Sequence, residues 1–339
     1  MLKYILKRIV MMIPVILGVL TIVFLLNSLT PGDPAQLILG GDYTEEAYVQ
    51  LREEMGLDQP VIVRYVNYIA DFFTKFDLGT SYVTKQPIRT EILTRWGPTC
   101  ILAFSSIALA ILIGMSVGII SAVKQYSAID NISMGLSMTF VSVPNFWLAL
   151  MLILLFAVEL KWLPASGISN KLGWILPIVT LAICSSANIA RTTRSSMLEV
   201  IRQDYIDTAK AKGLSEWTII IRHAVRNALL PIITQIGIQV GVQLGGVLAI
   251  EQVFGIPGLG TYIITAINGR DYPAIQGCVV FLAIVFSFVN LAVDIIYTFV
   301  DPRLKDSFKM QSSLKKNQKL VKELTKQSRL AAGQEGGIR

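Results

Sequence analysis

Long apolar runs alternate with shorter polar segments along most of this chain. The first run, Ile9 to Leu29, contains no charged residue. As an α helix it would be about 31 Å long, enough to cross the hydrocarbon core of a bilayer. Five more runs follow, at about residues 98–123, 134–158, 174–190, 229–250 and 277–300. The pattern predicts an all-α integral membrane protein with six transmembrane helices.

The beginning of the chain predicts a retained span. Residues 1–8 are basic, and the stretch from Thr30 to Pro34 follows the first run without a small-residue cleavage site. We therefore expect a membrane anchor rather than a secretory signal peptide. Pro144 and Pro177 lie within or at the start of later runs, where a kink is tolerated if neighbouring groups satisfy the freed carbonyl oxygens.

The largest internal polar segment, residues 30–97, is expected to lie outside the membrane. Between Ile62 and Phe73 its apolar residues recur at helical spacing, with polar residues elsewhere on the helical wheel. This predicts an amphipathic helix that lies either on the lipid surface or on the helix bundle. The division of the chain would be 1–97 for the first span and outer segment, 98–305 for a five-helix core, and 306–339 for a basic tail.

Charge asymmetry sets the expected orientation. Segment 30–97 has ten acidic and six basic residues, whereas 191–228 has seven basic and four acidic, and 301–339 has ten basic and four acidic. Cytoplasmic loops are enriched in Lys and Arg. Both termini and the 191–228 loop are therefore expected in the cytoplasm, and the tail suits either an anionic lipid surface or plain solvent.

Composition narrows the chemistry. The chain is 53% hydrophobic and 16% charged, with a net charge of +7 and a mean hydropathy of +0.59. The positive charge lies in the termini and one loop, so a nucleic-acid partner is not expected. There are three cysteines and one histidine, without metal-ligand spacing. No Walker A, HExxH or GxSxG motif is present, so we expect no catalytic residues, no metal site and no cofactor bound by this chain.

The fifth apolar run has two distinct faces. Glutamines recur every four residues, at Gln235, Gln239 and Gln243. Glycines recur with the same period, at Gly237, Gly241 and Gly245. The two rows are offset by two residues, about 200° on a helix wheel. The glycine row would let another helix approach closely. The glutamine row would either line a route for a polar solute or form interhelical hydrogen bonds.

The end of the fifth run is rich in turn-forming residues. Glu251, Pro257, Gly258 and Gly260 would form a shaped lid or turn, and they are candidates for an outer gate. Asp294 is nearly the only acidic candidate for a proton relay within a span, but buried charges are generally paired, which favours a structural pair with a nearby Lys or Arg. A stand-alone secondary transporter or channel would need such intramembrane ionisable residues.

The segment from Asp204 to Pro231 is polar and helix-favouring around Gly213, which predicts two short helices joined by a sharp turn. Asp207-Thr208-Ala209, three residues and Gly213 resemble the EAA signature of ABC-importer permeases. The signature's glutamate is Asp207 here and its first alanine is Thr208. The stretches RTTRSSMLEV, RHAVRNALLP and PGLGTYIITAINGRDYPAIQG, in this order, are similar to the first permease subunit of the dipeptide, oligopeptide and nickel family.

That resemblance implies a type I ABC-importer permease fold and a function in ATP-driven import of di- or oligopeptides; nickel, glutathione or haem are alternative cargoes. It implies a coupling loop with these residues: Asp204, Asp207, Thr208, Ala209, Ala211, Gly213, Arg222 and Arg226. Ala209 and Ala211 would fit a cleft of a partner, and Asp207 would pair with the partner or cap the turn. The implied partners are a second permease, two ATPases that bind ATP and Mg²⁺, an extracytoplasmic solute-binding protein, and the lipid of a bacterial inner membrane.

Overall fold

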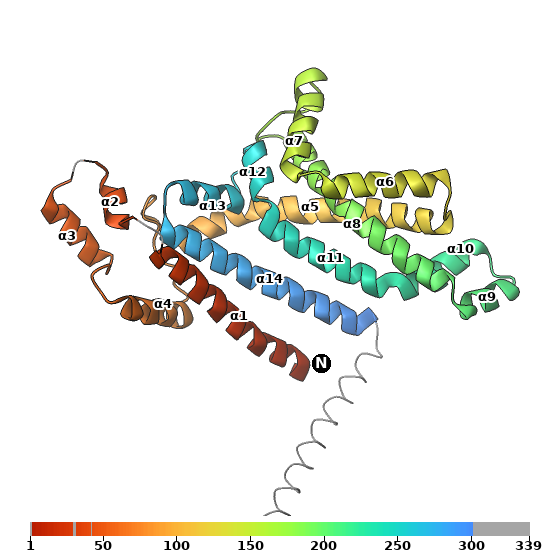
Figure 1. Ribbon diagram of the computed structural model, residues 1–339, viewed down its shortest axis with the longest axis horizontal. Coiled ribbons are helices and arrows are strands. Elements are labelled where there is room, and N and C mark those ends of the chain that lie inside the picture. Colours follow the sequence, from red (N-terminus) through yellow and green to blue (C-terminus); the bar gives the residue numbers. More distant parts are fainter. Residues whose placement is uncertain (1, 30–31, 42, 301–339) are drawn as a thin grey trace, which may run out of the picture. The chain divides into compact units, whose positions relative to one another are not determined.

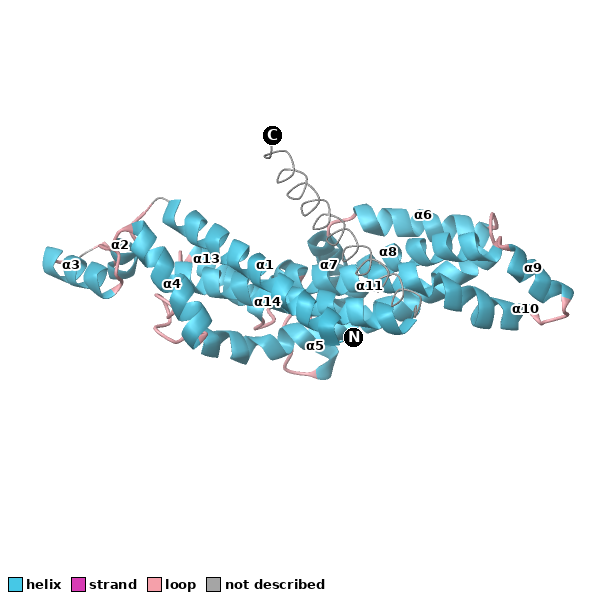
Figure 2. Ribbon diagram, turned by 90° about the horizontal axis from the view of Figure 1, so that it is seen from below, coloured by secondary structure: helices cyan, strands magenta, loops and turns pink. Residues whose placement is uncertain are grey.

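The computed structural model describes residues 2–29, 32–41 and 43–300. The basic tail expected at 306–339 lies outside this range. All named elements of the described residues are helical (Figure 2). The segment between the first two long helices contains α2 (Pro34–Leu39), α3 (Glu45–Glu54) and α4 (Val61–Lys75). The remaining α helices are α1 (Leu2–Leu29), α5 (Ile88–Val123), α6 (Ala128–Ser142), α7 (Asn145–Ile153), α8 (Ile175–Ile201), α9 (Asp204–Ala211), α10 (Glu216–Thr218), α11 (Arg226–Gly246), α12 (Leu248–Phe254), α13 (Leu259–Asn268) and α14 (Tyr272–Val300).

Among the described residues, five helical segments are long and apolar enough to cross a membrane, and two bent helix pairs could add to them. The long segments are Arg8–Leu29, Ile88–Val123, Lys171–Ile201, Glu216–Gly245 and Tyr272–Ile296. The all-α membrane architecture expected from the apolar runs is therefore confirmed. The chain divides into two units, Met1–Ala292 and Val293–Arg339, and the features below belong to the first.

The predicted third span is not one helix. Helices α6 and α7 meet at Pro144 with a bend of 104° (Figure 1). Proline lacks the backbone N–H that would continue the helix, and it disfavours helical geometry in the residue before it. Val143 is accordingly extended, with φ −79° and ψ 129°. The sequence predicted a tolerated kink, whereas the structure has a sharp corner, followed by a π-helical segment at Leu154–Glu159.

Helices α5 and α8 pack side by side along much of their length (Figure 1). Two glycines of α5 make this close approach possible. A Cβ atom on Gly114 would lie 2.7 Å from the backbone oxygen of Ser186, and one on Gly118 would lie 2.6 Å from that of Ala190. This Gly-x-x-x-Gly pair permits close helix contact in the same way as the row predicted on the fifth run. Neither glycine was predicted from the sequence to be a packing residue.

The amphipathic helix expected near residues 62–73 is α4, and its apolar face is divided between two environments. Tyr65 shares a 2.7 Å hydrogen bond with Thr21 of α1, and Phe72 is buried. Ile62 and Phe73, in contrast, are exposed. The helix therefore packs on α1 with one side and leaves apolar side chains uncovered on the other.

Candidate functional site

The loop that resembles the EAA signature contains a short helix, a tight turn and the start of a long helix. Helix α9 ends near Lys212, and Gly213 follows with φ +75°. Residues without glycine's freedom rarely adopt this left-handed conformation. Ser215 then caps the next helix by accepting a hydrogen bond from the Thr218 N–H. The helical segment from Glu216 runs on to Gly245, through a π-helical stretch at 219–225.

This continuity corrects the expectation of two short helices: α9 is separate, but the second helix belongs to the span that follows. Ile206 and Ala209 of α9 are buried, and both join a cluster with Ile219 and Ala224. Ala209 therefore packs against this chain itself, on the side of α9 that faces the buried cluster. Ala211 is exposed.

The exposed face of α9 carries most of its charge. Asp207 pairs with Lys210 at 2.9 Å within the same helix, instead of capping the turn. Both side chains are more than half exposed, so the pair contributes little, about 0–1 kcal/mol, and it can exchange readily for another partner. Asp204 and Thr208 are also exposed, and the Thr208 hydroxyl donates to the Asp204 carbonyl oxygen at 3.1 Å.

One side-chain contact ties α9 directly to the long helix. The amide of Asn227, at the start of α11, donates to the Tyr205 hydroxyl at 2.9 Å and to the His223 carbonyl oxygen at 2.9 Å. Arg222 and Arg226 are exposed on the same stretch, close in sequence to this link. Together with Ile206 in the buried cluster, this hydrogen bond joins α9 to the start of α11.

A polar groove runs between α6, α8 and α11. Its larger part has a volume of about 790 Å³ and is lined by polar side chains that include Gln235. A second cavity of about 320 Å³ is lined by residues that include Gln239 and Asn145. Asn188 of α8 borders both, so the two cavities adjoin. All three predicted glutamines therefore line these cavities, Gln235 the larger one and Gln239 and Gln243 the smaller.

The third glutamine is used for packing. The Gln243 side-chain oxygen accepts a hydrogen bond from Ser106 of α5, and its nitrogen donates to the Ser185 hydroxyl of α8 at 2.7 Å. Gln243 is buried, and it also borders the smaller cavity. Gln235 and Gln239 thus line the cavities, whereas Gln243 borders the smaller cavity and also joins three helices.

The glycine row is likewise uneven. A Cβ atom on Gly241 would lie 2.3 Å from the ring of Phe286 on α14, whereas nothing lies within 4 Å of one on Gly245. Gly237 is buried. Within the described residues, the close contact expected of this row is found at Gly241, and Gly245 has no neighbour of this chain to admit.

The larger cavity of the groove is lined by an ion pair that is buried on its acidic side. Arg194 of α8 donates two hydrogen bonds to Asp130 of α6, at 2.6 and 2.7 Å, and Asp130 is 1% exposed. Asp130 also accepts from the Tyr126 N–H at 3.0 Å. Such bidentate geometry is strong and specific, so this pair fixes α6 against α8. Asp130, Arg194 and Asn188 were not predicted as site residues. Of the three, only Asn188 lies within a predicted apolar run, where a polar residue was the available signal.

The predicted outer gate is a corner between two short helices. Helices α12 and α13 meet at 90°. Glu251 is fully buried, and its carboxylate accepts from the Thr99 hydroxyl at 2.6 Å, the Gly260 N–H at 2.7 Å and the Thr261 N–H at 3.1 Å. The carboxylate thus caps the N-terminus of α13, where backbone N–H groups lack helical partners.

The glycines at this corner make room for the carboxylate. A Cβ atom on Gly258 would lie 2.3 Å from the Glu251 carboxyl group, and one on Gly260 would lie 2.6 Å from the Leu248 Cα. Pro257 is exposed. The expected lid over residues 252–260 is therefore in part helical, and Glu251 is an internal cap rather than a surface residue.

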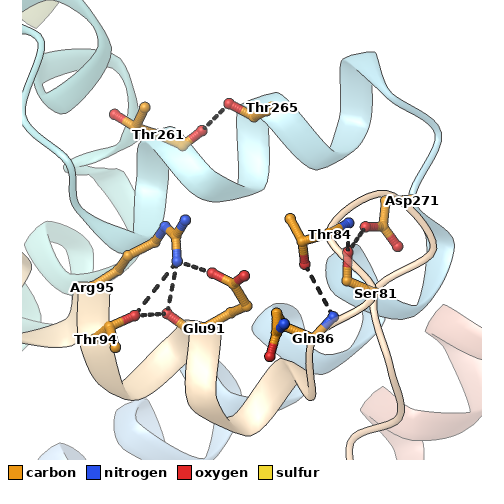
Figure 3. A network of polar contacts seen from close by, with 9 residues as sticks. All are labelled: Ser81, Thr84, Gln86, Glu91, Thr94, Arg95, Thr261, Thr265 and Asp271. Atoms are coloured by element: carbon orange, nitrogen blue, oxygen red, sulfur yellow. Dashed lines mark hydrogen bonds and ion pairs between the residues drawn. The ribbon is translucent and has the colours of Figure 1, made fainter.

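A second buried carboxylate joins the outer segment to this region (Figure 3). Asp271, between α13 and α14, accepts hydrogen bonds from the Ser81 hydroxyl and from the Tyr82 N–H at 3.0 Å. Arg95 and Glu91 pair on the facing turn of α5. The turn at residues 81–86 is thereby held against the corner that follows α13, and sequence reasoning did not identify this contact.

Comparison with known proteins matches nearly the whole described chain. Residues 114–306 match the family described as binding-protein-dependent transport system inner membrane component. Residues 1–103 match the N-terminal family of the same membrane components.

Three relatives illustrate the similarity. A dipeptide transport system permease protein, DppB, of Alkalihalophilus pseudofirmus is 42% identical over 333 residues, covering 90% of this chain and 100% of the relative. A putative peptide transport system permease protein of Brucella abortus is 42% identical over 309 residues, covering 89% and 98%. The glutathione transport system permease protein GsiC of Salmonella typhimurium is 40% identical over 305 residues, covering 90% and 99%.

The fold also matches a solved structure. A chain of the MetNI methionine ABC transporter, in an inward-facing conformation, superposes with a TM-score of 0.52 at 21% identity, covering 62% of this chain and 96% of that chain. At this identity the match shows the type of fold.

Proposed function

The chain belongs to the family of binding-protein-dependent transport system inner membrane components, and from this membership we propose that it imports short peptides as one permease subunit of an ATP-driven complex. Peptide, dipeptide and glutathione transport are the activities named for its relatives, and glutathione is itself a short peptide. Nickel and haem are not peptides, so the activities named for these relatives support them less as cargoes. The family consists of membrane components, with ATP hydrolysis on separate subunits.

The proposed complex contains this chain, a second permease, two cytoplasmic ATPases with ATP and Mg²⁺, and an extracytoplasmic solute-binding protein. It lies in a bacterial inner membrane. Both termini and the α9 loop face the cytoplasm, as the Lys and Arg distribution supports. The outer segment that contains α3 and α4 and the turn at 81–86 would receive the binding protein.

One structural observation supports the coupling role most directly. Helix α9 presents an exposed face, while Ile206 and the Tyr205–Asn227 hydrogen bond join it to the start of α11. Helix α11 carries Gln235 and Gln239 along the polar groove. A displacement of α9 by an ATPase would therefore be passed to the wall of the route without an intervening flexible loop.

The test replaces Gly213 with proline in the complete complex reconstituted in liposomes. Proline fixes φ near −65°, which is incompatible with the φ of +75° at this position. We expect the Gly213→Pro complex to assemble and to lose peptide-stimulated ATP hydrolysis together with uptake.

Gly40→Pro is the matched control, because Gly40 also has a positive φ and an N–H that closes a helix, but it lies in the outer segment. Full stimulation of ATP hydrolysis by peptide in the Gly213→Pro complex would contradict the coupling role. Absence of ATP-dependent uptake of any peptide by the unaltered complex would contradict the proposed cargo.

A further inference from the structure

The inner part of the groove contains four charged side chains, and two of them neutralise each other. Asp130 and Arg194 form the bidentate pair described above. The other two, Arg191 and Glu199, line the same cavity and are exposed. Neither has an ion-pair partner within the part of the chain that the structure describes. The groove therefore presents one available cation and one available anion to whatever occupies it.

Both charges lie on α8, at a separation that its geometry fixes. Eight residues separate Arg191 from Glu199, which corresponds to about 12 Å along a helix axis. Arg191 lies beside Asn188, where the groove meets the narrower cavity lined by Gln239. Glu199 lies nearer the end of α8 that leads into α9.

The spacing and the signs of these charges match a particular ligand. A short peptide with free ends carries a carboxylate at one end and an ammonium group at the other. An extended chain spans at most about 3.3–3.6 Å per residue, so three to four residues bring the two ends about 12 Å apart. Side-chain amides of Asn188 and Gln235, which both line this cavity, can donate to and accept from peptide groups between them.

We propose that the groove holds a short zwitterionic peptide of three to four residues, with its carboxylate at Arg191 and its ammonium group at Glu199. This assignment rests on the proposed function and specifies the chemical class of cargo and its direction in the groove. It also accounts for two charges of opposite sign that line one groove and have no ion-pair partner among the described residues.

The first experiment measures ATP-dependent uptake by the complete reconstituted complex. The cargoes are trialanine, trialanine amide and N-acetyl-trialanine, each below saturation. Removing one charge-assisted contact corresponds to about tenfold or more in affinity. We expect Arg191→Gln to lower trialanine uptake about tenfold and to leave uptake of the amide at the level of the unaltered complex. Glu199→Gln should lower trialanine uptake similarly and spare the N-acetyl peptide.

Arg202→Gln is the matched control, because Arg202 is an exposed arginine at the C-cap of the same helix and does not line the groove. Each variant is compared with the unaltered complex on the same cargo, so the preference of the binding protein cancels. Equal losses for free and blocked peptides would overturn the assignment and would instead indicate that Arg191 anchors the helix to lipid headgroups.

A second experiment exchanges the two charges and measures uptake of unmodified trialanine alone. It tests the same contacts of the peptide ends and does not depend on whether the binding protein accepts blocked peptides. Arg191→Glu and Glu199→Arg should each reduce uptake. The double variant should recover it, since the peptide can then bind in the reverse direction. The two side chains are too far apart along the helix to restore a direct ion pair. A double variant no better than the worse single variant would overturn the assignment, while normal transport by the unaltered complex would leave the proposed function intact.

Discussion

Replacement of Glu251 tests whether one buried carboxylate holds the corner between α12 and α13. Three donors point at it: the Thr99 hydroxyl, the Gly260 N–H and the Thr261 N–H. In Glu251→Ala the hydroxyl can turn toward the Arg95 carbonyl oxygen, 3.4 Å away, but the two backbone donors have no helical partner. A buried unsatisfied donor costs about 1–3 kcal/mol. The expected destabilisation is therefore about 2–6 kcal/mol.

Glu251→Gln separates shape from hydrogen bonding. The amide oxygen can still accept from both backbone N–H groups, so the expected loss is only about 1–2 kcal/mol, the difference between a charged and a neutral acceptor. At roughly 2 °C per kcal/mol for a chain of this size, Glu251→Ala should lower Tm by roughly 4–12 °C and Glu251→Gln by roughly 2–4 °C.

The assay follows thermal unfolding of the purified chain with a thiol-reactive dye at one fixed heating rate. Cys184 and Cys278 are buried and become reactive when the bundle opens. Glu159→Ala is the control, since Glu159 is exposed and should leave Tm unchanged. If Glu251→Ala had the same Tm as the Glu159→Ala control, the Glu251 carboxylate would not stabilise the corner between α12 and α13.

Two further predictions follow from close contacts and charge. Gly118→Ala places a Cβ atom 2.6 Å from the Ala190 backbone oxygen, and it should lower the free energy of unfolding by about 1–3 kcal/mol. Gly241→Ala meets only the movable, half-exposed ring of Phe286, so its Tm should fall less. Equal Tm values for the two variants would refute this distinction. At Asp33, burial raises the carboxyl pKa, but hydrogen bonds from Tyr48 and the Ala35 N–H and the Arg52 charge outweigh it, and the pKa falls below 3.8. The stability that ionised Asp33 contributes is present above its unfolded pKa and is lost as the pH falls through the folded value. Arg52→Gln should therefore lower Tm at pH 7 by the equivalent of about 1 kcal/mol or less, and this difference should begin to narrow as the pH falls below about 4. A difference of constant size in melting curves at pH 7 and pH 3 would contradict the prediction.

The apolar runs predicted the long helices because a membrane span depends on length and hydrophobicity, which one sequence displays directly. The left-handed turn at Gly213 was predictable for a similar reason, since a lone glycine in a helix-favouring polar stretch marks a turn. The continuous helix from Glu216 to Gly245 was missed because polar residues at its start suggested a separate segment. Hydropathy reports the surroundings of a helix and does not mark where the helix begins.

The helix bends and the contacts of the buried charges were harder to predict from the sequence. Pro144 signalled a kink, but the 104° corner depends on packing partners that no local pattern names. Glu251 was placed in an outer gate, yet its role as a cap requires Thr99, which is 152 positions away in the sequence. The pair of Asp130 and Arg194 likewise joins residues 64 positions apart. Such contacts are set by tertiary structure. A single sequence shows both residues but does not show that they are in contact.

The corner around Glu251 also bears on the order in which the protein can be made. Helices α12 and α13 have 7 and 10 residues, which correspond to about 10 and 15 Å, too short for either to enter a bilayer as an independent span. Synthesis, however, proceeds from the N-terminus. Thr99 is already in the membrane on α5 when Glu251 emerges, and the remaining donors follow within 10 residues. We therefore expect membrane insertion of this region to await α5, and a truncated chain that lacks α5 should release Glu251 and both short helices to the aqueous side.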